Sequence, residues 1–360
     1  MHKNFTYAIA ATVLAGSGLT AVGTAVADDN TTSIRHAESS VSTTAQAGST
    51  AAGQAAVDRT SQDNAKLLRD FYSAFTRGDV EAAKKFVTAD FLMHVPGKGT
   101  NAGEYWGPDG LAAFMKNIQA WNGGAFAMQV PHVAVSGEHG FTREVVDINR
   151  KHDPDRMWQL RFTMNYTFKA GKVSEAWTMP EDQRLYDAYW TAPQDAAAAK
   201  PAAVKGSPAA SPEPAPSHPF DVRKATNAKN LAFGREFYKK FWEGDLEGIR
   251  AFIDKDIVIT IPGRSDISGT FKGFDGFLEF RDKVMATVGD RYKLDVAAMA
   301  ADDKGVFAKE FIRMNHPWND QVRPVTVSLY YTVQDGKIVK MEDFPGDTYA
   351  WEAFFTKPRA

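Results

Sequence analysis

The sequence predicts an α+β protein made of two tandem copies of one domain. Three observations predict it: two long segments repeat each other, the first part of each copy carries apolar residues at helical spacing, and the later part alternates as strands do. Each copy is therefore expected to place a curved, mainly antiparallel (mixed) sheet on three helices.

The repeat is read directly from the sequence. One copy contains FYSAFTRGDVEAAKKFV and the other contains FYKKFWEGDLEGIRAFI. Gly78 corresponds to Gly244, 166 positions later, and Gly171 corresponds to Gly336, 165 positions later. Such a steady offset over copies of about 125 residues indicates a domain duplication rather than a solenoid of short repeats.

Each copy opens with an amphipathic helix and a second helix that begins at a cap. Asp79 and Asp245 follow a glycine and precede an apolar stretch, so we expect them to N-cap the second helix. A strand ending in Pro-Gly comes next, and a third helix is expected from about residue 109 in copy one and 275 in copy two.

The rest of each copy reads as strands joined by tight turns. Gly171 and Gly336 mark hairpins between the last two strands. The strands predicted are 91–95, 128–136, 140–149, 157–168 and 172–179 in copy one, and 257–261, 292–300, 305–314, 323–333 and 337–344 in copy two.

Three segments lie outside the copies. Residues 1–27 combine an early lysine, an apolar run and small residues at the end, which predicts a secretory signal peptide; the alternative is a membrane anchor. Residues 28–60 and 192–222 are rich in Ala, Ser, Thr and Pro, so we expect a disordered segment and a linker. The two domains are then 61–191 and 223–356.

Composition excludes several classes of function. The chain has no cysteine, which excludes disulfides, thiolate metal sites and a cysteine nucleophile. The net charge is −2 and basic residues are scattered, so no nucleic-acid partner is expected. No metal-ligand spacing and no phosphate-binding loop stands out, so we expect no metal and no cofactor. Export without a further membrane-length run predicts a periplasmic or extracellular protein with no membrane span after signal cleavage.

Pro-Gly and glycine motifs recur at the same places in both copies. They are His94-Val95-Pro96-Gly97, Gly103, Gly107 and Gly110-Leu111 in copy one, and Ile261-Pro262-Gly263, Gly269, Gly273 and Asp275-Gly276 in copy two. Copy two also has Glu342-Asp343-Phe344 in its last strand. With this order of elements the chain resembles the SnoaL-like family of the nuclear-transport-factor-2-like superfamily, which has the ketosteroid-isomerase-like fold. The resemblance implies two cone-shaped domains, each with an apolar pocket for a small molecule. It implies no single activity, because the superfamily contains isomerases, cyclases, hydrolases and non-catalytic binding domains.

Three carboxylates are candidates for a catalytic role in such a pocket. Glu144 and Glu310 match between the copies, and alternation places each on an apolar strand face. The alternative is a pair of solvent-facing charges. The resemblance implies an acid or base at Asp343, where copy one has Thr178. Burial in an apolar pocket raises the pKa of a carboxyl group toward neutrality, as proton transfer requires.

His94 is the fourth catalytic candidate. It lies on the first strand of copy one, where the family often has a pocket-facing histidine or aromatic residue, and Thr260 takes its place in copy two. A neutral imidazole there acts as base or hydrogen-bond donor. The alternative is a half-buried histidine held by a neighbour.

Four residues are expected to contact a ligand: Trp158, Tyr330, Trp106 and Thr260. Two of them, Trp158 and Tyr330, lie on the long strands. Most aromatic residues of the chain are expected in the core instead. The histidines at 132, 139 and 152 are expected at the surface.

Three functions remain open at this point. The first is an exported protein that binds a small apolar, polyketide-like or steroid-like molecule, with its two copies packed as an intramolecular pseudo-dimer. The second is an enzyme of isomerase, cyclase or hydrolase type that uses a pocket carboxylate or histidine. The third is a non-catalytic interaction module of the cell envelope. The copies differ at Thr178/Asp343, so any chemistry is expected in one copy only.

Overall fold

The computed structural model describes residues 51–191, 220–288, 293–313 and 325–357. These ranges fall within one compact unit, Gly48–Ala360. The predicted signal peptide, most of the predicted disordered segment and nearly all of the linker lie outside the described residues. Within the described residues, no helix has the length and apolar character needed to cross a membrane.

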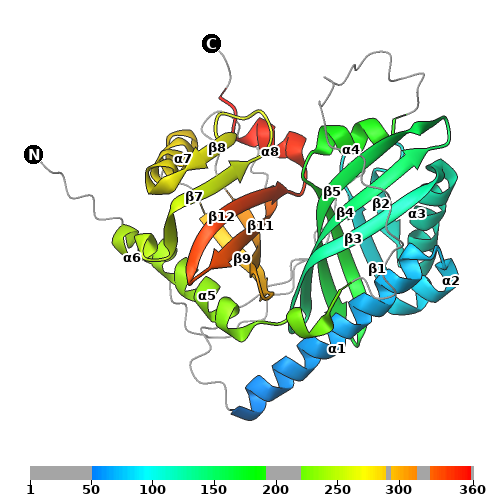
Figure 1. The fold of residues 1–360 in the computed structure, drawn as a ribbon, viewed down its shortest axis with the longest axis horizontal. Helices are drawn as coiled ribbons and strands as arrows, with labels where there is room; N and C mark the ends of the chain where they lie inside the picture. Colours follow the sequence, from blue (N-terminus) through cyan, green and yellow to red (C-terminus); the bar gives the residue numbers. More distant parts are fainter. Residues whose placement is uncertain (1–50, 192–219, 289–292, 314–324, 358–360) are drawn as a thin grey trace, which may run out of the picture. The chain divides into compact units, whose positions relative to one another are not determined.

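Copy one begins with helices and ends with a short helix after its last strand (Figure 1). Its elements are α1 (Ala51–Thr76), α2 (Val80–Ala83), η1 (Lys84–Phe86), β1 (Val87–Val95), β2 (Gly103–Trp106), α3 (Gly107–Trp121), β3 (Asn122–Ser136), β4 (His139–Arg150), β5 (Asp153–Lys169), β6 (Lys172–Pro180) and α4 (Gln183–Tyr189).

After a short 3-10 turn, copy two has the same order of helices and strands, without a counterpart of η1 (Figure 1). Its elements are η3 (Val222–Lys224), α5 (Ala228–Glu243), α6 (Leu246–Arg250), β7 (Ile253–Ile261), β8 (Gly269–Lys272), α7 (Gly273–Val288), β9 (Lys293–Ala301), β10 (Gly305–Arg313), β11 (Val325–Gln334), β12 (Lys337–Pro345) and α8 (Thr348–Phe354).

Each copy has one six-stranded mixed sheet with the same strand order. The orders are β2-β1-β6-β5-β4-β3 and β8-β7-β12-β11-β10-β9. The first and last long strands pair in parallel in both copies, β1 with β6 and β7 with β12, and all other pairs are antiparallel. The predicted α+β class, with a mixed sheet packed on helices in each copy, is confirmed.

The second helix of each copy begins where the sequence places it. The carboxylates of Asp79 and Asp245 accept hydrogen bonds from the backbone N–H groups of Ala82 and Gly248, which confirms both as N-caps. Gly244 ends α5 with φ +66°, a left-handed conformation that glycine adopts without steric cost.

The structure also differs from the prediction in two respects. Residues 51–60 belong to α1 and not to the predicted disordered segment, because alanine, the strongest helix former, continues the amphipathic helix toward the N-terminus. The short elements β2, β8, α4 and α8 were not predicted, since strands of four residues and helices of seven give little periodicity.

The outer faces of the two sheets share an apolar cluster. It joins Phe141 of β4 to Phe307 of β10, whose rings stack with centroids 5.5 Å apart. Polar contacts add to it: Arg143 binds Glu342 and the Ser328 hydroxyl donates to the side-chain oxygen of Asn165 at 3.1 Å. The two copies therefore contact each other through the outer faces of their sheets.

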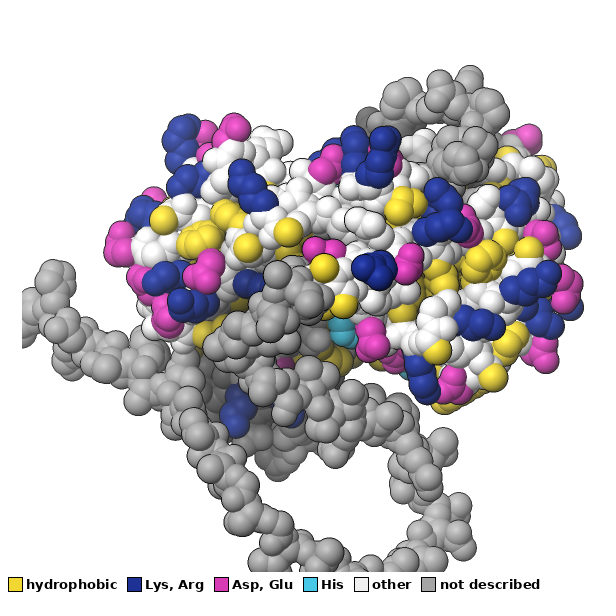
Figure 2. All heavy atoms as spheres, turned by 90° about the horizontal axis from the view of Figure 1, so that it is seen from below, with side chains coloured by type: hydrophobic (Ala, Val, Ile, Leu, Met, Phe, Trp, Pro, Cys, Tyr) yellow, Lys and Arg dark blue, Asp and Glu magenta, His cyan; other side chains and the backbone are white. Residues whose placement is uncertain are grey.

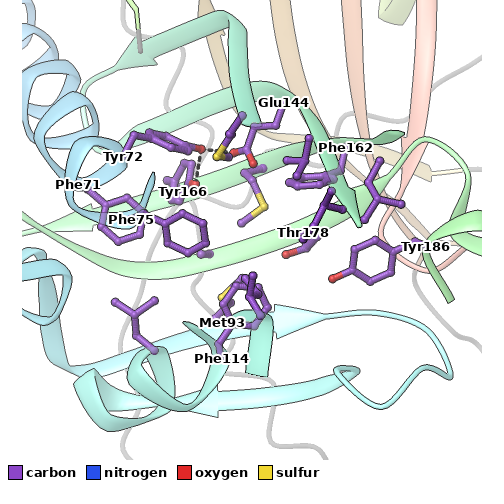
Figure 3. Close-up of a pocket in the computed structure, with 18 of the residues that line it drawn as sticks. Phe71, Tyr72, Phe75, Met93, Phe114, Glu144, Phe162, Tyr166, Thr178 and Tyr186 are labelled. Atoms are coloured by element: carbon purple, nitrogen blue, oxygen red, sulfur yellow. Dashed lines mark hydrogen bonds between the residues drawn. The ribbon is translucent and has the colours of Figure 1, made fainter. Parts of the chain in front are cut away.

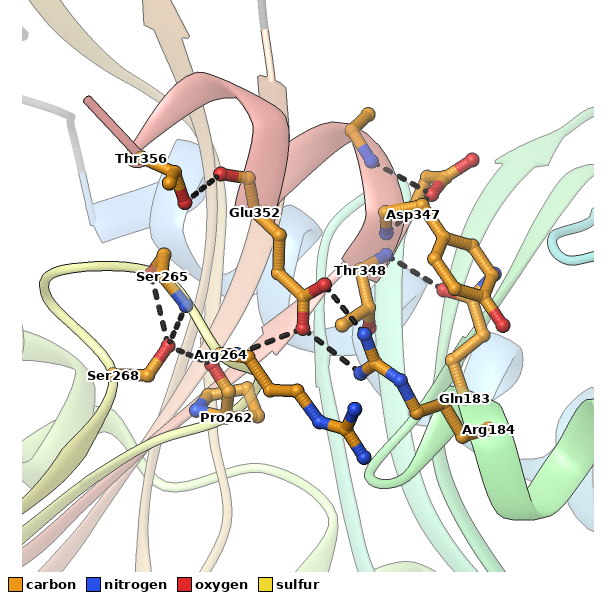
Figure 4. Close-up of polar contacts among 12 residues, drawn as sticks. Gln183, Arg184, Pro262, Arg264, Ser265, Ser268, Asp347, Thr348, Glu352 and Thr356 are labelled. Carbon is orange, nitrogen blue, oxygen red and sulfur yellow. Dashed lines mark hydrogen bonds and ion pairs between the residues drawn. The ribbon is translucent and has the colours of Figure 1, made fainter. Parts of the chain in front are cut away.

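The terminal helices of the two copies make a second set of contacts, drawn in Figure 4. Arg184 of α4 donates two hydrogen bonds to Glu352 of α8, at 2.8 and 2.6 Å. Beside this pair the backbone N–H of Thr348 donates to the side-chain oxygen of Gln183 at 2.6 Å. Charged side chains of both signs are interspersed on the face shown in Figure 2.

Candidate ligand pockets

Each copy encloses a cavity between its helices and the inner face of its sheet. The cavity of copy one, here called pocket one, has a volume of about 760 Å³ with its open mouth included; that of copy two, pocket two, has about 560 Å³. Figure 3 shows pocket one between the strands and the helices that bear Phe71, Phe75 and Phe114.

The two pockets are lined by matching positions. Pairs of equivalent residues include Phe71/Phe237, Tyr72/Tyr238, Phe75/Phe241, Phe114/Phe280, Glu144/Glu310, Tyr166/Tyr331, Thr178/Asp343, Tyr186/Trp351 and Trp190/Phe355. The lining is mostly aromatic and aliphatic in both copies. The main polar difference is that Asp343 stands in pocket two where Thr178 stands in pocket one.

A buried chain of hydroxyl groups leads to Glu144 in pocket one (Figure 3). The Tyr72 hydroxyl donates to the carboxylate of Glu144, and the Thr142 hydroxyl donates to the same oxygen at 2.9 Å. The Tyr72 and Tyr166 hydroxyl oxygens are 2.6 Å apart. Because the one proton of Tyr72 is used on Glu144, Tyr166 donates to Tyr72.

Pocket two repeats this chain without the threonine. The Tyr238 hydroxyl donates to Glu310, and the hydroxyl oxygens of Tyr238 and Tyr331 are 2.7 Å apart. Ala308 stands where copy one has Thr142. Glu310 therefore has one fewer donor than Glu144 among the described side chains.

Burial changes the acid–base behaviour of both glutamates. Burial raises the pKa of Glu144 to about 7, although the hydrogen bonds from Tyr72 and Thr142 act to lower it. Burial likewise raises the pKa of Glu310 to about 7, against the bond from Tyr238. Both groups therefore titrate near neutral pH and can exist as acid or as carboxylate.

Asp343 is the second buried acid of pocket two. Its side chain is buried, and burial together with the charge of Glu310 raises its pKa well above the ordinary value. Its Oδ1 atom has no hydrogen-bond partner among the described residues. A buried polar atom without a partner is costly, so this atom is suited to receive a polar group of a ligand.

The structure brings three of the four predicted catalytic residues to the pockets. Glu144 lines pocket one, and Glu310 and Asp343 line pocket two. The strand alternation that predicted an inward position for the two glutamates is confirmed. Their catalytic role remains a prediction.

His94 does not face the pocket, and its predicted position is wrong. Met93 of β1 lines pocket one, so alternation turns the next side chain to the other face of the sheet. There the His94 ring stacks on Trp177 at 3.7 Å, and its Nε2 atom lies 3.3 Å from Glu175.

The four predicted ligand contacts also lie outside the pocket linings. Trp158 is buried in the core against Tyr189, and Arg156 lies 3.8 Å over its ring. Trp106 is 62% exposed at the end of β2. Thr260 alternates with the buried Ile259 and so occupies the other face of β7.

Tyr330 belongs to the contact between the copies. Its hydroxyl lies 2.8 Å from Nδ1 of His132, and the same nitrogen lies 3.0 Å from Asp302. His132 was expected at the surface; it is half-buried because copy two covers it. Residue type and strand position do not show which face of a sheet a second domain covers.

Sequence reasoning missed the four tyrosines beside the glutamates. Their signal was the repeat itself, since Tyr72 matches Tyr238 at the same offset as Glu144 and Glu310, and Tyr166 matches Tyr331. In the described part of the chain, no group of three or more His, Asp and Glu side chains is arranged to hold a metal ion.

Comparison with known families fits this architecture. The profile of the SnoaL-like domain matches residues 68–176 and 234–341, which together make up more than half of the chain. The chain belongs to the SnoaL-like domain family. Each match runs from within the first helix to within the last strand of one copy and includes its tyrosine–glutamate pair. No curated protein matches the chain.

Three of the solved structures that are similar to this SnoaL-like protein are each about as long as one of its copies. Bal32a from a soil-derived mobile gene cassette is 20% identical, with 35% of this chain and 96% of that chain covered and a TM-score of 0.33. An NTF2-like protein from Burkholderia xenovorans is 19% identical, with 36% and 98% covered and a TM-score of 0.32. TerC, co-crystallised with polyporic acid, is 23% identical, with 36% and 98% covered and a TM-score of 0.32.

Proposed function

We propose that this protein binds small apolar molecules of polyketide or steroid type in its two pockets. The observation that carries the proposal is the lining of pocket one: aromatic and aliphatic side chains surround a cavity in which Glu144 is the only carboxylate among the described residues. Burial of a ligand's apolar surface against such walls supplies about 25 cal/mol per Å².

The lining of pocket one favours binding in that copy. Glu144 accepts from Tyr72 and Thr142 on one oxygen, and Tyr72 accepts from Tyr166. The other lining residues are mostly aromatic and aliphatic, so we expect the ligand contacts to be mainly apolar.

Pocket two supports a second candidate function, proton transfer by an enzyme of isomerase, cyclase or hydrolase type. The observation in its favour is the pair of acids, Glu310 and Asp343, in one apolar cavity. Two carboxyl groups that repel each other titrate at different pH values, which provides one acid and one base. The Oδ1 atom of Asp343 has no hydrogen-bond partner among the described residues, so it is the atom best suited to bind a polar group of a substrate.

The same proposal includes the arrangement and location of the protein. Contacts between the outer sheet faces support an intramolecular pseudo-dimer in which each copy keeps its own pocket. The signal-peptide pattern of residues 1–27 supports export to the periplasm or the exterior. N-terminal sequencing of protein recovered outside the cytoplasm tests export: a start near residue 28 is expected, and an intact N-terminus in the cytoplasm contradicts it.

Mass spectrometry of the purified protein under non-denaturing conditions tests the binding function. We expect retained apolar molecules, or saturable binding of a neutral apolar dye such as Nile red. Absence of both overturns the proposal.

The variant Asp343→Asn separates the two candidate functions. If the protein only binds its ligand, the variant still binds and no turnover is seen in either protein. If copy two is an enzyme, the variant loses turnover and keeps binding.

A further inference from the structure

Pocket two contains two carboxyl groups, and no basic side chain among its described lining residues neutralises them. The Asp343 side chain is 6% exposed and that of Glu310 4% exposed, and both line the cavity. Tyr238 donates to Glu310, but Oδ1 of Asp343 has no partner among the described residues. In pocket one the equivalent of Asp343 is Thr178, so the excess acid is specific to copy two.

The elements around the cavity supply no positive charge. The titratable groups that face Asp343 are Tyr238 from α5, Glu310 from β10 and Tyr331 from β11. The described lining residues of β9, α7 and α8 are apolar or aromatic, and no Lys, Arg or His is among the lining residues described. The charge of Glu310 acts on Asp343 and opposes its ionisation.

Aromatic side chains make up about half of the remaining wall, and aliphatic side chains make up the rest. The aromatic residues that line pocket two are Phe237, Tyr238, Phe241, Phe277, Phe280, Tyr331, Trp351 and Phe355. The face of an aromatic ring attracts cations, and cages of such rings beside a carboxylate bind quaternary ammonium groups. An anion would be repelled by both features.

We infer that pocket two selects an organic ammonium ion with apolar substituents, for which Asp343 is the counter-ion and the aromatic rings form the cage. This inference rests on the proposed function, because it takes pocket two to be a binding cavity. A cation relieves the repulsion between Asp343 and Glu310 and gives Oδ1 of Asp343 a partner. A neutral ligand of the same shape gains only the apolar contacts.

Pocket one provides the matched comparison within the same chain. It has the same aromatic positions on α1, but on α3 only Phe114 is aromatic, because Leu111 stands where pocket two has Phe277. Its single glutamate accepts hydrogen bonds from Tyr72 and Thr142 on one oxygen. Thr178 stands in place of Asp343, so pocket one lacks the second carboxyl group that would serve as the counter-ion. We expect one ammonium site per chain, in copy two, although both pockets accept neutral apolar molecules.

The test compares phenyltrimethylammonium with tert-butylbenzene, which has the same shape without the charge. Each is titrated against the full chain loaded with Nile red, and displacement of the dye is measured. We expect the cation to bind pocket two more tightly than the neutral isostere by roughly tenfold or more. Asp343→Asn should remove this preference and leave tert-butylbenzene within about twofold of its original affinity.

The pH dependence adds a second readout. Phenyltrimethylammonium has no titratable proton, so any change of its affinity reports the pocket. Because the bound cation needs an ionised carboxyl group, its affinity should rise with pH by up to about tenfold per pH unit while Asp343 binds a proton. The affinity of tert-butylbenzene should not rise with pH.

Two further variants keep the test decisive. Asp343→Thr places the residue of copy one into copy two and should act like Asp343→Asn if the latter folds poorly. Asp256→Asn, an exposed acid of copy two outside the pocket lining, is the control and should leave cation binding unchanged. If Nile red binds but the cation binds no better than tert-butylbenzene, this inference is overturned and the proposed function stands; if Nile red does not bind at all, both fail.

Discussion

Arg143 of copy one donates hydrogen bonds to both carboxylate oxygens of Glu342 in copy two, at 2.7 and 3.0 Å. Each residue is the chain neighbour of a pocket acid, Glu144 in β4 and Asp343 in β12. Alternation along a strand explains this: one face of each strand lines a pocket, and the other face contacts the second copy. The same strands therefore carry both the residues that line the pockets and the residues that join the two copies.

Loss of Arg143 should destabilise the protein through Glu342. Burial raises the pKa of Glu342, but the hydrogen bonds and charge of Arg143 outweigh this and hold it below its usual range. Arg143→Met leaves a largely buried carboxylate with Lys340 as its remaining described cation. We expect a loss of about 2–4 kcal/mol in the free energy of unfolding, measured in urea.

The control for that variant is an exposed ion pair. Arg313→Met breaks the contact with Asp295, where both side chains are more than half exposed. A change of at most about 1 kcal/mol is expected there. Equal effects of the two variants would contradict a buried role for Arg143.

The stability of the protein should depend on pH through Glu144. The raised pKa means that folded protein keeps the proton up to about pH 7, whereas the unfolded chain keeps it only to about pH 4.3. The stability that this proton contributes is complete below about pH 4.3 and is lost as the pH rises through 7.

Glu144→Gln should remove this dependence. Between about pH 5 and 8 the variant should lose less stability than the wild type, by about 1–3 kcal/mol in urea unfolding. Glu310→Gln should behave alike. Glu247→Gln, on the exposed surface of α6, is the control and should leave the pH profile unchanged. If the free energy of unfolding of Glu144→Gln differed from that of the wild type by the same amount at every pH, Glu144 would not take up a proton on folding.

The two tyrosine–glutamate pairs should differ in their tolerance of a lost hydroxyl. Tyr72→Phe leaves Glu144 with the hydrogen bond from Thr142, whereas Tyr238→Phe leaves Glu310 without a described side-chain donor. We expect about 1 kcal/mol of destabilisation in copy one and about 2–3 kcal/mol in copy two. Thermal unfolding of the two variants gives the comparison, and the reverse order would show that Thr142 does not support Glu144.

His94 should be unimportant for ligand binding. Its ring stacks on Trp177 on the face of β1 that is turned away from pocket one. His94→Ala should therefore leave the affinity for Nile red within about twofold of the wild type. Met93→Ala, on the inner face of the same strand, is the positive control. A larger effect at position 94 than at position 93 would mean that the pocket extends through the sheet.

The sequence predicted the fold more fully than the pocket linings. The offset between Glu144 and Glu310 and the alternation around them placed both acids inside, because a half-buried strand has a strict period of two. The same period could have placed His94 outward once Met93 was known to face inward. That parity was not readable from the sequence, since Phe91, Leu92 and Met93 are all apolar, although only the odd positions 91, 93 and 95 are buried there.

Other features depend on contacts between distant segments. The parallel pairing of β1 with β6 leaves no local pattern, because the two strands are separated by the rest of the domain. The position of Tyr330 follows from contact with His132 of the other copy. Such contacts are decided by the packing of one sheet on another, which residue type alone does not encode.

The number of ligands bound per chain tests the central claim most directly. Met128 of β3 and Leu294 of β9 occupy equivalent positions in the linings of the two pockets. Met128→Trp and Leu294→Trp each place a large ring in one pocket, at a cost to stability of about 1–3 kcal/mol. Calorimetric titration with a neutral apolar ligand should give two sites in the wild type, one in each single variant and none in the double variant. Binding that is unchanged in the double variant, with the fold retained, would contradict the assignment of the pockets as ligand sites.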